Sequence, residues 1–126
     1  MSLRTPLGRA RGLGSAKEGV SHWWSQRVSA VALVPLTVWF VMAMASMAGA
    51  DHATVIAWVG SPWVATFLMA FIVLLFYHAV LGVQVVIEDY VHHEGLKLAA
   101  ILGVKFMAGL FGIVAVLAIL RIVLLA

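Results

Sequence analysis

Cysteine is absent from the 126 residues of this chain. Its absence excludes a disulfide framework, a thiolate zinc site and a cysteine-ligated iron–sulfur cluster within the chain itself. Charge is scarce as well, because Asp, Glu, Lys and Arg make up 10% of the residues. The average for soluble domains is about 25%. So little charge cannot cover a water-facing surface, and the composition therefore excludes an ordinary soluble domain.

Hydrophobic residues, in contrast, make up 64% of the chain, and the mean hydropathy is +1.10. Residues 28–49 and 64–87 carry no formal charge, and residues 98–120 carry only Lys105, which can extend its ammonium toward the membrane surface. Each segment is long enough to cross a hydrocarbon core about 30 Å thick. The sequence predicts an all-α integral membrane protein with three transmembrane helices.

The predicted membrane domain spans residues 21–126, with helices at about 21–49, 62–93 and 97–124. Residues 1–20 are basic and glycine-rich, and we expect a flexible tail there rather than a helix. The net charge is +3, and most of the basic residues precede or open the first apolar segment: Arg4, Arg9, Arg11, Lys17 and Arg27. This arrangement favours a topology signal over nucleic-acid binding and places the N-terminus in the cytoplasm.

Short polar signals predict where the helices begin and end. Ser21 or Ser25 is a candidate cap for the first helix, and Asp51 for a single turn in the connector. The Ser61-Pro62 pair is typical of a helix start, with a capping hydroxyl followed by proline at the first helical position. Gly95 is expected to end the second helix.

Within the second segment, His78 is the only histidine embedded in an apolar run. Eleven helical residues turn through about 1100°, close to three full turns, so His78, Gly82 and Asp89 share one face. Asp89 is ~16 Å from His78 along the helix axis. A histidine at membrane depth is costly unless it is paired or acts as a ligand. Two interpretations stay open: an axial haem ligand with a glycine notch beside it, or a hydrogen bond that joins two helices.

Three further residues are candidates near the cytoplasmic edge. Arg27 could contact a haem propionate or the mouth of a quinone site, or simply anchor the helix in the positive-inside sense. The Tyr90 phenol could donate to a carbonyl oxygen, and the Asp89 carboxylate could orient donors. The alternative for this pair is an ordinary interfacial tyrosine beside a solvated aspartate.

The second segment reads H-x3-G-x-QVV-x2-DYVH from His78 to His92, and the first opens HW-x2-QRV-x-A from His22 to Ala30. In order and spacing, these motifs resemble the smaller hydrophobic membrane-anchor subunit of succinate dehydrogenase, respiratory complex II. The resemblance covers residues 22–126 and neither motif would suffice alone.

This resemblance implies a multi-pass anchor in the cell inner membrane that is not an enzyme by itself. It implies a second membrane-anchor subunit, with one haem b held between the two anchors and His78 as the axial ligand to its iron. It also implies docking of an iron–sulfur subunit and of a flavoprotein that oxidises succinate in the tricarboxylic acid cycle. Ubiquinone would be reduced where the iron–sulfur subunit meets the anchor, with Tyr90 and Asp89 in the quinone site and Arg27 near the haem propionate or quinone mouth.

Two other functions remain open at this point. The same parts could serve a quinol:fumarate reductase, which runs the reaction in the opposite direction. A non-redox structural or accessory membrane subunit would keep the three helices and lack a haem.

Overall fold

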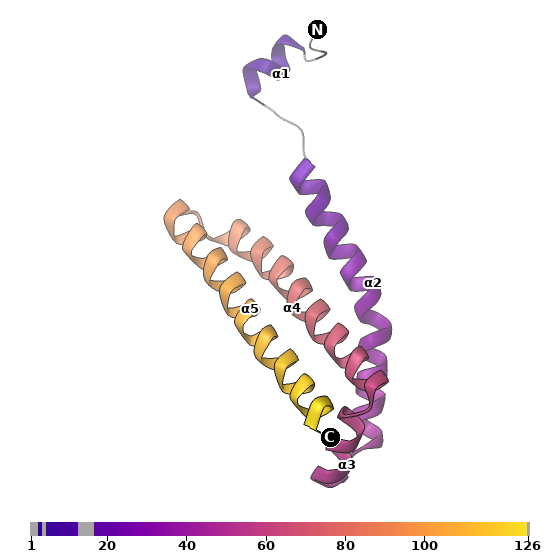
Figure 1. The fold of residues 1–126 in the computed structure, drawn as a ribbon. Coiled ribbons are helices and arrows are strands. Elements are labelled where there is room, and N and C mark those ends of the chain that lie inside the picture. Colours follow the sequence, from indigo (N-terminus) through magenta and orange to yellow (C-terminus); the bar gives the residue numbers. More distant parts are fainter. Residues whose placement is uncertain (1–2, 4, 13–16, 126) are drawn as a thin grey trace.

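The structure, a computed structural model, describes residues 3, 5–12 and 17–125. Its helices are α1 (Pro6–Arg11), α2 (Lys17–Ser46), α3 (His52–Val59), α4 (Pro62–Tyr90) and α5 (Glu94–Leu125) (Figure 1). Three of them, α2, α4 and α5, are long and apolar enough to cross a membrane. The described residues contain no strand, so the predicted all-α fold with three membrane-spanning helices is confirmed.

Helix α4 is the centre of the arrangement. Both α2 and α5 pack against it, whereas in the described part of the chain α2 and α5 do not contact each other. Figure 1 shows α4 and α5 running side by side in opposite directions, with the start of α2 and the α4–α5 turn at the same end. The short helix α3 and the end of α5 lie at the opposite end (Figure 1). The two helices that pack on α4 are therefore separated from each other by α4.

The helices pack most tightly at the end that carries α3. Ala65, Leu68 and Ile119 form the buried cluster there and join α4 to α5. Aromatic rings join α2 to this end of the molecule. Trp39 of α2 stacks on Trp58 of α3, with ring centroids 5.8 Å apart. Most other large apolar side chains are exposed on this chain. Such surfaces are stable only against lipid or partner helices, which agrees with a membrane protein.

The predicted signals at Asp51 and Pro62 hold, whereas the predicted capping serines do not. Asp51 caps α3, because its Oδ1 accepts from the Thr54 backbone N–H at 2.9 Å. Pro62 occupies the first position of α4 as predicted, but the Ser61 hydroxyl makes no capping hydrogen bond. The caps predicted at Ser21 and Ser25 were wrong, since α2 begins at Lys17 and both serines lie inside it.

The turn between α4 and α5 also differs from the prediction. Helix α4 ends at Tyr90 rather than near residue 93, and Gly95 lies in the first turn of α5 instead of ending α4. The physical reason is a cap that the sequence analysis missed. The Nδ1 atom of His93 accepts from the Leu96 backbone N–H at 3.1 Å and so satisfies a free donor at the start of α5.

The expectation that residues 1–20 contain no helix was wrong, because α1 forms within them. Thr5 caps α1 through its Oγ1, which accepts from the Gly8 N–H at 3.0 Å, and Pro6 follows at the first helical position. The first long helix ends at Ser46 rather than at residue 49, and Gly49 turns the chain with a φ of 83°. The division into a tail and a membrane domain stays a prediction.

Candidate functional site

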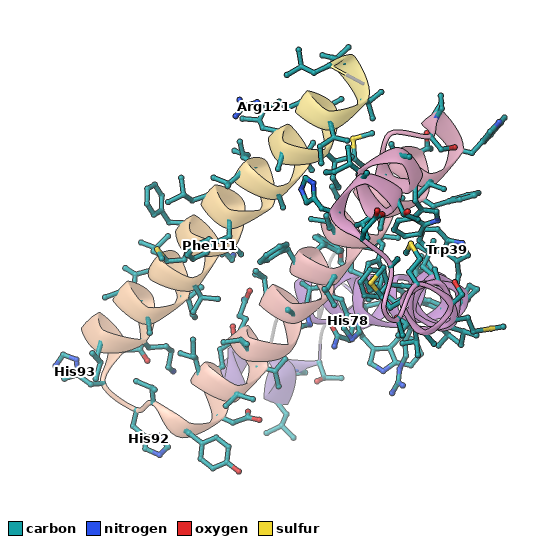
Figure 2. The ribbon with its side chains drawn as sticks, turned by 90° about the horizontal axis from the view of Figure 1, so that it is seen from below. Trp39, His78, His92, His93, Phe111 and Arg121 are labelled. Atoms are coloured by element: carbon teal, nitrogen blue, oxygen red, sulfur yellow. The ribbon has the colours of Figure 1, made fainter. Side chains whose placement is uncertain are left out.

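His78 lies in the middle of α4, about 18 Å along the helix axis from Tyr90. Its half-buried ring faces α2, with Nδ1 2.8 Å from the hydroxyl oxygen of Ser29. The other ring nitrogen, Nε2, is 3.4 Å from the side-chain Nε2 of Gln26. Figure 2 shows His78 between α4 and α2, far from His92 and His93 in the α4–α5 turn. The hydrogen bond between two helices, one of the two sequence interpretations, is therefore present.

Two arrangements of protons satisfy the neighbours of His78. In the first, the Ser29 hydroxyl donates to the Gln26 backbone carbonyl at 3.0 Å and His78 Nδ1–H donates to Ser29 Oγ at 2.8 Å. In the second, the Ser29 hydroxyl donates to Nδ1 and the proton of the neutral ring is on Nε2. The first arrangement leaves the lone pair of the neutral ring on Nε2. Ser29 is only 3% exposed, so this bond is shielded from competing water.

The Gln26 side chain is poorly satisfied in this arrangement. Its contact with His78 Nε2, at 3.4 Å, is at the long end of the range for a hydrogen bond. Its Oε1 atom is buried and has no hydrogen-bond partner. The Gln26 side chain also lies beside Gly82. A Cβ added to that glycine would be 3.7 Å from the side-chain nitrogen of Gln26. Buried amides are seldom left like this, so the position beside Nε2 is one that a further group could take.

An apolar hollow of about 390 Å³ opens beside His78. The α2 residues that line it are Ala30, Leu33, Val34, Thr37 and Val38. Among the described residues that line it, only His78 has a titratable side chain. The hollow thus offers one imidazole as a nitrogen ligand in a mostly apolar setting.

The other predicted site residues lie elsewhere. Tyr90 is the last residue of α4 and is 79% exposed, and its neighbour Asp89 is exposed as well. Arg27 is on α2, with its guanidinium carbon 5.3 Å from the centre of the Trp23 ring. Within the described ranges, no hydrogen bond or ion pair joins these three side chains to one another or to His78. The chain on its own thus presents these groups without assembling them.

Sequence reasoning missed Ser29 and Gln26 as partners of His78. The signal was available, because His22, Ser25, Gln26 and Ser29 recur at helical spacing in an apolar segment. Such a pattern places polar groups along one face, and that face turns out to pack on α4. The groove beyond it contains His22, whose Nε2 is buried and has no hydrogen-bond partner among the described residues.

Three spans, a ligand-capable histidine at membrane depth and exposed apolar faces define the chain as a multi-pass membrane anchor rather than a self-contained domain. The chain belongs to the succinate dehydrogenase/fumarate reductase transmembrane subunit family, which it matches over residues 1–120.

Individual relatives agree with this family. The chain is 37% identical over 106 residues to the succinate dehydrogenase hydrophobic membrane anchor subunit of Paracoccus denitrificans, covering 84% of this chain and 82% of the relative. It is 34% identical over 117 residues to the protein of the same name from Rickettsia conorii, covering 92% and 90% respectively. No solved structure matches the chain significantly.

Proposed function

We propose that this chain is the membrane-anchor subunit of a succinate:quinone oxidoreductase, and that it binds haem b together with a second anchor subunit and contributes to the site of ubiquinone reduction. The observation that carries the proposal is His78 itself, a histidine at membrane depth whose ring is hydrogen-bonded to the buried Ser29 hydroxyl and lines an apolar hollow. The names of the relatives support the assignment to a succinate dehydrogenase.

The residues around His78 fit a haem. An iron ligand must be a neutral imidazole with a free lone pair, and the second ring nitrogen of such histidines usually donates to a fixed acceptor. Ser29 would be that acceptor, and the hollow would take part of the apolar ring system. Gln26 would have to turn away from Nε2, which costs little because its present contacts are weak. A bound haem b would supply one-electron redox chemistry.

The other ligand to the haem iron would come from the second anchor subunit. Among the described residues, His22 lies near the start of α2, His52 lies in the connector helix and His92 and His93 lie at the α4–α5 turn. None of these shares the depth of His78, so the chain offers one ligand. Arg27 would then contact a haem propionate or the quinone mouth, because among the described residues its guanidinium lies against the Trp23 ring and makes no ion pair.

Tyr90 and Asp89 would serve the quinone. The Tyr90 hydroxyl would donate a hydrogen bond to a quinone carbonyl, and the Asp89 carboxylate would hold the donors around it in place. Their exposure at the end of α4 leaves both side chains available to another protein of the complex. The iron–sulfur subunit would dock at this end, and the flavoprotein would dock on the iron–sulfur subunit.

The assembly would lie in the cell inner membrane with the N-terminus in the cytoplasm. The basic residues ahead of α2 support this orientation through the positive-inside preference. The α4–α5 turn would then face the cytoplasm, where a soluble electron donor can reach Tyr90.

A dithionite-reduced minus oxidised visible spectrum of the affinity-purified complex tests the proposal, with the co-purifying chains identified by mass spectrometry. We expect a b-type band together with a flavoprotein, an iron–sulfur protein and a second small anchor. A preparation with no such band and no such chains would contradict the proposal and favour a non-redox membrane protein.

A further inference from the structure

A groove runs over α4 between α2 and α5, on the Tyr77 side of the helix. It exists because the two outer helices contact α4 without contacting each other in the described part of the chain. At the end near the start of α2 it widens into a hollow of about 680 Å³ with contributions from all three helices. Its polar groups include His22 and Ser25 of α2, Gln84 and Glu88 of α4, and Lys105 of α5.

The groove carries one cation and one anion at different depths. Lys105 lies eleven residues into α5, about 16 Å from the start of that helix, whereas Glu88 lies two residues before the end of α4. Since the two helices run antiparallel from a short turn, Glu88 is nearer the membrane surface and Lys105 is deeper (Figure 1).

Neither charge is neutralised within the described part of the chain. The Glu88 Oε1 accepts from Gln84 Nε2 at 2.9 Å, and no cation pairs with the carboxylate. Lys105 has no ion-pair partner there either. The buried, unpartnered Nε2 of His22 is a further free polar atom in the same lining. Of the two charges, Lys105 is the one below the membrane surface, where an ammonium either extends to the surface or finds an anionic partner. An occupant with an anion toward Lys105 and a cation toward Glu88 would match both charges.

A second hollow of about 260 Å³ continues the groove deeper into the membrane. It shares Tyr77 and Lys105 with the first and is otherwise apolar. On α5 it is floored by Ala108, Gly109 and Gly112, and an added Cβ at Gly109 would meet nothing within 4 Å. The small residues therefore keep a slot open for an apolar chain.

We propose that this groove binds one phospholipid with a zwitterionic headgroup that carries a primary amine, as in phosphatidylethanolamine. In such a lipid the phosphate lies next to the glycerol and the ammonium lies further out. Lys105 would form an ion pair with the phosphate, and Glu88 would form one with the ammonium. The apolar hollow would bind an acyl chain. An anionic lipid headgroup would be repelled by the Glu88 carboxylate. An apolar partner helix would bury both the Glu88 carboxylate and the Lys105 ammonium without partners of opposite charge.

Lipid retention by the purified complex tests this proposal. The complex is exchanged into nanodiscs with equal amounts of phosphatidylethanolamine and phosphatidylglycerol of matched acyl chains, gently re-extracted, and analysed by native mass spectrometry. We expect phosphatidylethanolamine to be retained about tenfold over phosphatidylglycerol, the ratio that about 1.4 kcal/mol gives. Equal retention, or a preference for phosphatidylglycerol, would overturn the proposal.

Three variants separate the parts of the site. Lys105→Met removes the phosphate contact and should lower retention of both lipids. Glu88→Gln removes both the ammonium contact and the repulsion of phosphatidylglycerol, so the two lipids should then be retained equally. Gly109→Leu fills the apolar slot without changing charge and should lower retention of both lipids. Lys97→Met is the matched control, because Lys97 pairs with Glu94 at the start of α5, outside the groove lining.

Unchanged retention and preference in the Lys105, Glu88 and Gly109 variants would refute the site. The lipid readout does not depend on haem, so it can fail while the haem spectrum of the same preparation is normal, and the reverse also holds. The two proposals are therefore tested separately on one sample.

Discussion

Nδ1 of His78 on α4 and the hydroxyl oxygen of Ser29 on α2 lie 2.8 Å apart. This is the shorter of the two contacts through which His78 joins the helices, and the Ser29 hydroxyl oxygen also lies 3.0 Å from the Gln26 carbonyl. An imidazole that binds iron through Nε2 carries its proton on Nδ1, and Ser29 is the acceptor that this tautomer needs.

Replacing Ser29 by Ala should weaken haem binding while keeping the fold. The variant removes the acceptor for Nδ1–H and leaves a side chain of similar size at a buried position. Loss of such an outer partner typically costs about 10- to 100-fold in affinity of a metal site. The measurement is haem content per complex and the midpoint potential of the b-type band.

Ser46→Ala is the control for this variant, because Ser46 is on the same helix, is exposed and bonds only the Ala43 carbonyl. Equal haem affinity and potential in the Ser29 and Ser46 variants would mean that Ser29 does not orient the ligand.

Replacing Tyr90 by Phe should lower the rate of quinone reduction about tenfold, the effect of losing roughly one hydrogen bond in the transition state. Succinate oxidation by a soluble artificial acceptor should be unchanged, because that reaction bypasses the quinone site. Tyr77→Phe, which alters the other tyrosine, should leave both rates as they are. A parallel loss of both activities in the Tyr90 variant would show that Tyr90 is structural.

The cap at Asp51 gives a prediction about pH. Hydrogen bonds from the side chain and the backbone N–H of Thr54 hold the pKa of the Asp51 carboxyl below its ordinary value of 3.8. A lowered folded pKa means that the cap stabilises α3 above pH 3.8 and that this contribution is lost as the pH falls through the folded pKa. The Thr54 amide resonance should therefore titrate with a midpoint below 3.8.

Asp51→Asn keeps an oxygen acceptor without a proton to titrate, so its Thr54 resonance should show no such midpoint. A midpoint at or above 3.8 in the unmodified chain would contradict the capping account.

The aromatic contacts at the α3 end should contribute to stability. Trp39 stacks on Trp58 and lies edge-on to Phe67 at 5.7 Å, and each such pair contributes about 0.5–1.5 kcal/mol beyond area burial. Trp39→Leu should therefore lower the free energy of unfolding by about 1–3 kcal/mol. The midpoint of SDS-driven unfolding in mixed micelles measures it.

The exposed Trp63 is the matched control for this variant. If Trp63→Leu lowers the midpoint as much as Trp39→Leu, the stacked rings are not the source of the stability.

The three long helices could be predicted because long uncharged segments have few alternatives in a membrane. The ends could not be placed as well, since they depend on single side chains. His93 caps the start of α5 with a ring nitrogen, which is an uncommon capping group. Thr5 and Pro6 start α1 within a segment whose composition indicated a tail.

For the site, the depth of His78 was readable from the sequence, but the identity of its partner was not. Ser29 and Gln26 meet His78 only through the packing of α2 on α4, a contact across about fifty positions in the chain. The groove between α2 and α5 was equally hidden, because it depends on two helices that stay apart.

The most direct test of the central claim is the haem stoichiometry of the purified complex carrying His78→Leu, compared with His52→Leu. His52 is exposed at the start of α3 and serves as the matched control. The proposed ligand role predicts that the His78 variant loses or visibly alters the b-type band while the His52 variant keeps one haem per complex. An unchanged spectrum and an unchanged haem content in the His78 variant would contradict the assignment.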